Sequence, residues 1–112
     1  MATTSVNVCP VDQVAVLEVE GDLTSSSDTA VEEAFQEAVQ DHSKVVLSFR
    51  QRDFINSAGI AILIDLMSQS QHSDVALRIA HPSNHFRKIF AIVGLTQHVP
   101  VFETVEDARR DF

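Results

Sequence analysis

The chain has a single cysteine, Cys9, among its 112 residues. An intramolecular disulfide and a cysteine-based metal cage are therefore excluded, and this cysteine usage fits a reducing compartment. With no histidine close in sequence, Cys9 is interpreted as a buried small apolar residue. The N-terminal residues carry no basic region or long apolar run, and the longest apolar run, 60–66, is interrupted by Asp65. We expect no signal peptide, no membrane span and a cytoplasmic, soluble protein.

Basic residues are scarce. Eight Lys and Arg side chains stand against 16 Asp and Glu side chains, which gives a formal net charge of −8. The basic residues occur singly or in short pairs and form no stripe along a helix or strand. Because a strongly acidic protein is repelled by phosphate backbones and by anionic membranes, we expect neither nucleic acid nor a membrane as a partner.

The three glycines, Gly21, Gly59 and Gly94, stand alone in the sequence. The chain therefore lacks a glycine-rich phosphate loop, and no serine lies in a G-x-S-x-G turn. His81 and His85 are four residues apart, but a proline separates them and no third metal ligand is evident. Solvated histidines are favoured over a metal site. These absences predict a protein that is not an enzyme and holds no metal or cofactor.

The apolar residues, 45% of the chain, are patterned for one domain spanning 1–112. The periodicity predicts strands at 5–9, 14–19, 44–49, 75–80 and 99–102, a turn at 10–12, and helices from 27 or 28 to about 40, 57 to about 71, 83–93 and 104–112. Strands that alternate with helices predict right-handed crossovers. We expect an α/β fold with a mostly parallel sheet, an antiparallel or edge N-terminal strand and about four helices.

Several residues predict how these elements begin, end and pack. The second helix, from Ser57, is apolar nearly all round. Gly94 is placed to end the third helix in a left-handed conformation. Pro100 predicts that the last strand lies at an edge, because proline cannot donate to a ladder. Thr104 is predicted to cap the final helix.

The segment most suggestive of function is 53–60, which joins a buried strand to the second helix. Loops at the carboxyl edge of a parallel sheet are where α/β domains place their functional residues. A phosphate on Ser57 would meet free backbone N–H groups and the positive end of the helix dipole. Ala58 and Gly59 are small, so a partner could approach closely. The alternative is purely structural, with Asn56 or Ser57 as a helix cap and Gly59 as a packing gap.

Two segments of the sequence resemble the STAS domains, the bacterial anti-sigma-factor antagonists and their relatives. The strand-loop-helix segment, 45–49 followed by 54–63, resembles the core motif of that family, and 17–23 resembles its second strand and the Gly-acidic-aliphatic turn after it. The resemblance extends over nearly the whole chain, including the Gly94-Leu95 step after the third helix. It implies a STAS fold.

The resemblance also implies a phosphorylation-controlled protein-binding switch. In that family the serine or threonine of a D-[ST]-x-G pattern is phosphorylated by a histidine-kinase-like serine kinase that doubles as an anti-sigma factor, and a PP2C-type phosphatase removes the phosphate. Ser57 would be the phosphoacceptor here, in a partner-binding surface made of Asp22, Asn56, Ser57, Ala58 and Gly59.

Two positions depart from the family pattern. Asn56 stands where the usual residue is an aspartate, so it can cap a helix but carries no charge. Thr24 stands where many members carry an acidic residue. Two other roles of STAS proteins stay open at this point. One is an accessory subunit of a lipid-transport ATPase, and the other is a structural component of a larger signalling complex. The sequence leaves the oligomeric state undecided.

Overall fold

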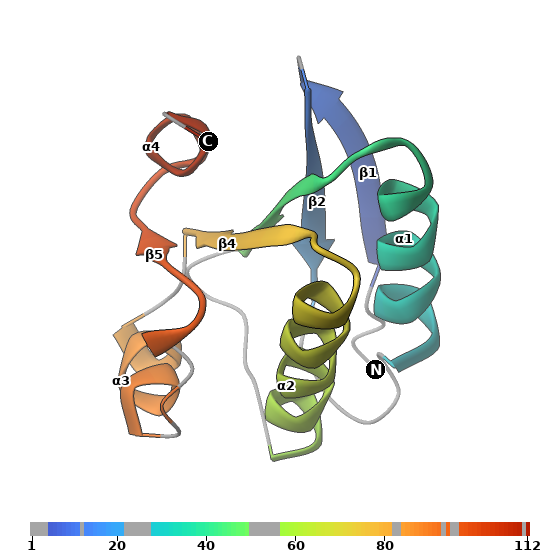
Figure 1. The fold of residues 1–112 in the computed structure, drawn as a ribbon. Coiled ribbons are helices and arrows are strands. Elements are labelled where there is room, and N and C mark those ends of the chain that lie inside the picture. Colours follow the sequence, from blue (N-terminus) through green and yellow to red (C-terminus); the bar gives the residue numbers. More distant parts are fainter. Residues whose placement is uncertain are drawn as a thin grey trace.

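The elements of secondary structure follow in the predicted order β-β-α-β-α-β-α-β-α (Figure 1). The computed structural model describes residues 5–11, 13–21, 28–49, 57–81, 84–92, 94, 97–110 and 112. The elements are β1 (Ser5–Val11), β2 (Val14–Glu20), α1 (Asp28–Asp41), β3 (Lys44–Ser48), α2 (Ser57–His72), β4 (Ala76–Ala80), α3 (Asn84–Ile92), β5 (Val101–Phe102) and α4 (Val105–Arg109).

The five strands form one sheet in the order β1-β2-β3-β4-β5. β1 pairs with β2 in antiparallel fashion, whereas β2, β3, β4 and β5 are parallel to one another. The predicted mixed, mostly parallel sheet is therefore confirmed. β2 is an inner strand, and its residues Val14, Ala15, Val16 and Leu17 are all buried. A strand that is apolar on both faces needs cover on both sides of the sheet.

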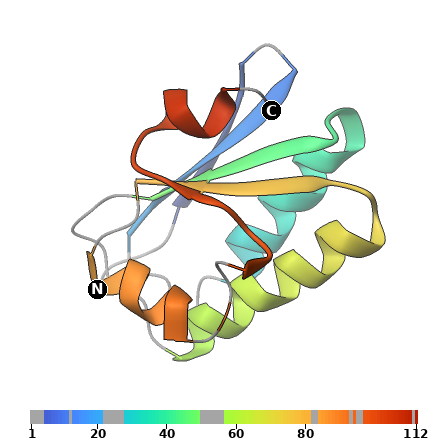
Figure 2. The same ribbon diagram turned by 60° about the vertical axis from the view of Figure 1, so that its left-hand side comes forward.

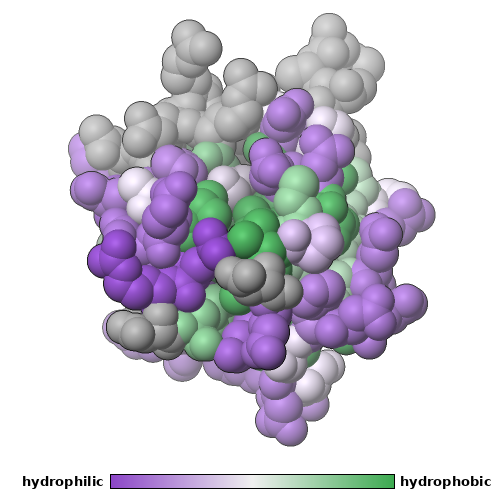
Figure 3. All heavy atoms as spheres, turned by 90° about the horizontal axis from the view of Figure 1, so that it is seen from above, coloured by the Kyte–Doolittle hydropathy of each residue, from purple (hydrophilic) through white to green (hydrophobic). Residues whose placement is uncertain are grey.

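The cover is unequal on the two faces. Figure 2 shows α1, α2 and α3 below the sheet and α4 alone above it. The larger core lies on the three-helix side and includes alternate residues of β2, β3 and β4, together with Phe35, Leu66, Phe86 and Phe90. The smaller core lies under α4 and contains Val14, Val16, Val46, Ala80 and Ala108. In the view from above, apolar side chains remain visible at the centre, between hydrophilic ones (Figure 3).

Arg78 connects β4 with the end of α4 on the upper face of the sheet. It extends from β4, and its Nη1 donates hydrogen bonds to the carbonyl oxygens of Ala108 and Arg110, at 3.0 and 2.9 Å. Its guanidinium carbon lies 4.1 Å from the ring centroid of Phe112 and 5.3 Å from that of Phe102. The C-terminal end of a helix carries a partial negative charge, so a cation is favourable there.

Three elements, β1, β5 and α4, differ from the sequence prediction by two residues or more at one end. β1 continues through Pro10, which was predicted to lie in a turn, and Pro10 pairs with Ala15. This is possible because a proline nitrogen in an edge strand can face away from the neighbouring strand. β5 is restricted to two residues that follow Pro100. α4 ends at Arg109, because Arg110 is extended and the chain returns to place Phe112 against Arg78.

Two residues predicted to begin or end a helix are confirmed in that role. Thr104 is the N-cap of α4, and its side chain accepts a hydrogen bond from the Asp107 N–H at 3.0 Å. Gly94 follows α3 with a φ of 77°, the left-handed conformation that was predicted. α2, although its sequence is apolar nearly all round, is not buried on every side, because Ala61 and Ile64 are exposed.

Candidate functional site

The candidate site lies at the carboxyl edge of the sheet, where β3 ends. Beyond β3, Phe49 is buried and its N–H donates to the carbonyl of Ala80 at 2.9 Å. The Phe49 ring meets Phe86 edge-on, with centroids 5.4 Å apart and planes at 73°. Phe90 completes the cluster at 6.4 Å from Phe49 and 5.9 Å from Phe86. These contacts bind the ends of β3 and β4 to α3, so the chain leaves a rigid base before it reaches α2.

Ser57 is the first residue of α2 and is exposed. Ala58, which follows it, is half-buried, and Gly59 is buried. The helix is held from beneath by Ile62, Leu63 and Leu66, which belong to the larger core, while Ile60 packs against that core. Thus the serine projects from a well-anchored helix, with only small residues directly after it.

The electrostatics of the first turn of α2 favour an anion. No acidic residue lies in this turn. The first N–H groups of a helix have no partner within the helix, and the helix dipole adds a partial positive charge there. The first acidic side chain along α2 is Asp65, two turns later. The helix dipole would therefore favour a phosphate on the Ser57 hydroxyl, and no acidic side chain in the first two turns of α2 would repel it.

A network of side chains fixes α2 against α1. Gln69 donates from its amide nitrogen to both carboxylate oxygens of Glu32, at 3.0 and 3.2 Å, and to Asp65 at 2.8 Å. Gln36 in turn donates to the amide oxygen of Gln69 at 2.8 Å. This network was not predicted from the sequence, in which these residues belong to the polar surfaces of two separate helices.

The structure brings three of the five predicted partner-binding residues together: Ser57, Ala58 and Gly59 form the first turn of α2. Asp22 and Asn56 lie outside the described residues. β2 and β3 are parallel, with Glu18 paired to Ser48, so both strands end at the same edge of the sheet.

Cys9 differs from its sequence interpretation as a buried apolar residue. It is half-buried, and its thiol donates to a carboxylate oxygen of Glu18 at 2.9 Å. The hydrogen bond to Glu18, burial and the negative charge of Glu18 all raise the pKa of Cys9. A raised pKa opposes thiolate formation, which is the opposite of what a nucleophilic cysteine requires.

Two of the histidines contact a backbone carbonyl oxygen four residues earlier in the chain. His72 ends α2, and its Nδ1 lies 2.8 Å from the Ser68 carbonyl oxygen. His42 makes the same kind of contact with Ala38, at 3.2 Å. Within the described part of the chain, no group of three or more His, Cys, Asp or Glu side chains could hold a metal ion. Among the same residues, no helix is long and apolar enough to cross a membrane.

Together these features define an α/β domain with an exposed serine at the start of a helix anchored to a mostly parallel sheet. The chain belongs to the STAS domain family, whose model matches residues 5–108. The family and the fold class predicted from the sequence are thereby confirmed. No curated protein sequence matches the chain significantly.

Solved structures share this fold at low sequence identity. An anti-sigma factor antagonist from Mycobacterium paratuberculosis superimposes with a TM-score of 0.81 at 22% identity, over 95% of this chain and 91% of that one. A putative anti-sigma factor antagonist from Thermotoga maritima gives 0.79 at 15% identity, over 92% and 90%. The Bacillus cell fate determinant SpoIIAA in its phosphorylated form gives 0.68 at 16% identity, over 95% and 96%.

Proposed function

We propose that this STAS domain is an anti-sigma-factor antagonist, a non-enzymatic binding protein that is switched by phosphorylation of Ser57. The observation that carries the proposal is the position of Ser57, exposed at the start of α2 in a first turn that has no acidic residue. The structural relatives include anti-sigma factor antagonists, and one of them, SpoIIAA, is described in a phosphorylated form. The proposed partners are a histidine-kinase-like serine kinase, which is also the anti-sigma factor, and a PP2C-type phosphatase.

Unphosphorylated, the start of α2 offers the exposed Ser57 hydroxyl and the half-buried Ala58 methyl to the kinase. Asp22 and Asn56 are proposed to contribute to the same surface. A phosphate adds about −1.5 to −2 charges at that point. Leaving an uncompensated charge in an interface costs about 3–5 kcal/mol, whereas the helix terminus favours the phosphate by at most about 2 kcal/mol. The modification therefore expels the partner while the domain stays folded.

The test uses the serine kinase of the same cell and three variants of this protein. We expect phosphate to map to Ser57 by mass spectrometry, and Ser57→Ala to abolish incorporation. Ser68→Ala is the matched control, because Ser68 is an exposed serine on the same helix. In binding assays, Ser57→Ala should retain the partner, and Ser57→Asp should weaken binding by about a hundredfold, which corresponds to about 2.7 kcal/mol. Phosphate at another residue, or equal affinity of the two Ser57 variants, would contradict the proposal.

A further inference from the structure

The first half of β4 is an open edge of the sheet. β4 pairs with β3 along its whole length, from Ala76 to Ala80, but only its last two residues pair with β5. The ladder to the β5 side begins where the Ile79 N–H donates to the Pro100 carbonyl at 2.9 Å. Before that point, β4 has no neighbouring strand on this side among the described residues.

Backbone direction shows what this edge offers. The Ala76 N–H donates toward β3, to Ser43, whereas the Ile79 N–H donates toward β5. Successive residues of a strand alternate in the neighbour they face, so the N–H and C=O of Leu77 point to the same side as those of Ile79. If the pairing of β4 with β5 extended toward the start of both strands, the Pro100 nitrogen would lie opposite the Leu77 carbonyl. Proline has no N–H to donate, so the segment before β5 cannot pair with Leu77 at this point.

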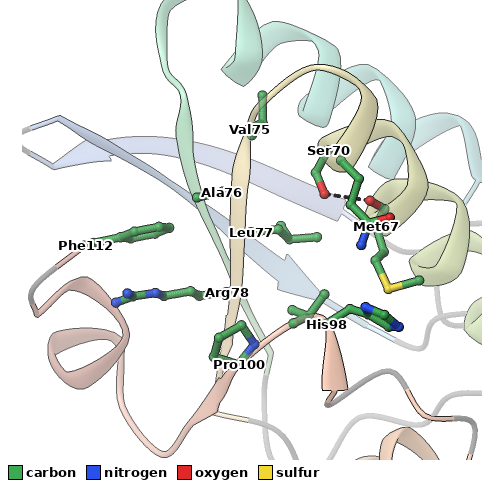
Figure 4. Close-up of a pocket in the computed structure, with 11 residues that line it drawn as sticks. Met67, Ser70, Val75, Ala76, Leu77, Arg78, His98, Pro100 and Phe112 are labelled. Carbon is green, nitrogen blue, oxygen red and sulfur yellow. Dashed lines mark hydrogen bonds between the residues drawn. The ribbon is translucent and has the colours of Figure 1, made fainter.

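A cavity of about 300 Å³ lies along this edge, lined by residues of α2, β4 and the segment before β5. Figure 4 shows that β4 divides the residues that line it. Leu77, Met67 and His98 lie on one side of the strand, and Arg78 and Phe112 lie on the other. A strand placed beside β4 would direct its side chains alternately to these two sides.

The two sides differ in chemistry. Leu77 is 7% exposed and Val99 1% exposed, and with Met67 they form an apolar wall. On the other side, the Arg78 guanidinium stacks on Phe112. Arg78 is a cation, and none of the residues that line the cavity is acidic, so a carboxylate is favoured over a cation beside Arg78.

We propose that the edge of β4 beside Pro100 is a docking site for an extended peptide segment of a partner protein, in which an apolar residue is followed by an acidic one. The peptide would add as a short strand next to Leu77, with its apolar side chain toward Met67 and its carboxylate toward Arg78. Main-chain hydrogen bonds supply the affinity in strand addition, and alternate side chains supply the specificity. The site is separate from the one proposed at Ser57, because it adjoins the opposite end of α2.

The test is a titration of the isotope-labelled full chain with blocked six-residue peptides, followed by amide NMR shifts. A peptide of alternating valine and glutamate should cause saturable shifts centred on Leu77 and Arg78. A valine–lysine peptide should bind about fivefold more weakly or worse. Methylation of alternate backbone nitrogens in the valine–glutamate peptide should lower its affinity about tenfold, because the methylated peptide cannot complete the hydrogen bonds to β4. Equal binding of the three peptides, shifts centred elsewhere, or no saturable shift up to about 10 mM would overturn the proposal.

A charge reversal at the edge provides the second arm. Ala76 is exposed, lines the cavity and lies on the Arg78 side of β4. Ala76→Glu should lower the affinity for the valine–glutamate peptide about fivefold, because the two carboxylates repel each other. The control is Ala91→Glu, the same change at an exposed alanine of α3. Its affinity for the valine–glutamate peptide should lie within about twofold of the wild-type value. Equal effects of the two variants would overturn the proposal, as would a self-association of the chain that the peptide displaces, because a second copy would then be the occupant.

Discussion

Removing the Arg78 side chain is expected to loosen α4 from the sheet. The side chain joins four parts of the fold, because it starts on β4, donates to two carbonyl oxygens at the end of α4, and packs against the rings of Phe102 and Phe112. Lys44 assists by donating to the Phe112 carbonyl oxygen at 2.6 Å. The five residues of α4 are too few to be stable without such contacts.

The size of the effect follows from these contacts. A hydrogen bond from a charged group contributes about 1.5–3 kcal/mol when buried, and a cation–π contact at a partly exposed site contributes about 0.5–1 kcal/mol. Arg78 is only half-buried, so each contribution takes the lower end of its range. Both hydrogen bonds and both ring contacts share one guanidinium, so their contributions do not add in full. We expect Arg78→Ala to lower the free energy of unfolding by about 2–3 kcal/mol. Arg78→Lys should lower it by about 1–2 kcal/mol, because an ammonium cannot bridge two carbonyls and stack at once.

Urea unfolding followed by circular dichroism measures this loss, and the corresponding fall in melting temperature is roughly 10 °C. Amide hydrogen exchange at Ala108 should accelerate more than exchange in β2. Arg110→Ala is the control, because Arg110 makes a surface pair with Asp107 at 3.5 Å and should cost no more than about 0.5 kcal/mol. The reasoning is refuted if Arg78→Ala is no less stable than Arg110→Ala, or if Arg78→Lys matches the wild type.

Two further predictions concern single residues. Gly94→Ala should lower the free energy of unfolding by about 1–2 kcal/mol. The whole cost is backbone strain, because φ is 77° and an added Cβ would meet nothing within 4 Å. Urea unfolding measures this loss, and an unchanged midpoint would contradict the prediction. Cys9 should react slowly with iodoacetamide at pH 8, because its raised pKa lowers the thiolate fraction. Glu18→Ala removes the hydrogen bond and the charge that raise this pKa, so the reaction should then accelerate, and an unchanged rate would show that Glu18 does not control the thiol.

The fold was predictable because its signals are local. The apolar periods of the strands and helices lie within single elements, and the alternation of the two types leaves few topologies. The errors fell where a distant contact decides the local structure. Pro10 continues β1 because the strand lies at an edge, and α4 stops at Arg109, after which Arg110 is extended and Phe112 lies against Arg78.

The candidate site was predictable only in part. Ser57 could be singled out because it follows a buried strand and starts an apolar helix, and its proposed role came from resemblance to a family. The role of Arg78 in the fold was missed, since it was counted among scattered basic residues. Its position between Leu77 and Ile79 does place it on the opposite face of β4 from the larger core. Nothing local in the sequence, however, pairs it with rings 24 and 34 residues away.

Whether the two proposed surfaces communicate can be decided from distance and charge. Ser57 begins α2, and Ser70, which lines the cavity at the β4 edge, is 13 residues further along the helix, or about 20 Å at 1.5 Å per residue. Two unit charges about 20 Å apart in water interact by about 0.2 kcal/mol, and physiological salt, with a screening length of about 8 Å, reduces this roughly tenfold. Even a doubly charged phosphate then contributes far less than thermal energy.

Ser57→Asp should therefore leave the affinity of the valine–glutamate peptide within about twofold of wild type, while it expels the kinase. A titration of the wild type and of Ser57→Asp with the same peptide measures this affinity. A change of about tenfold or more would require a displacement of α2 that carries the effect along its axis. Such a displacement would have to break the hydrogen bonds of Gln69 to Glu32, so Gln69→Ala, which removes that restraint, would then strengthen the coupling. If Ser57→Asp leaves the peptide affinity unchanged both with Gln69 present and in the Gln69→Ala variant, the two surfaces are independent. Exchange of partners at Ser57 would then leave a peptide segment bound at β4 in place.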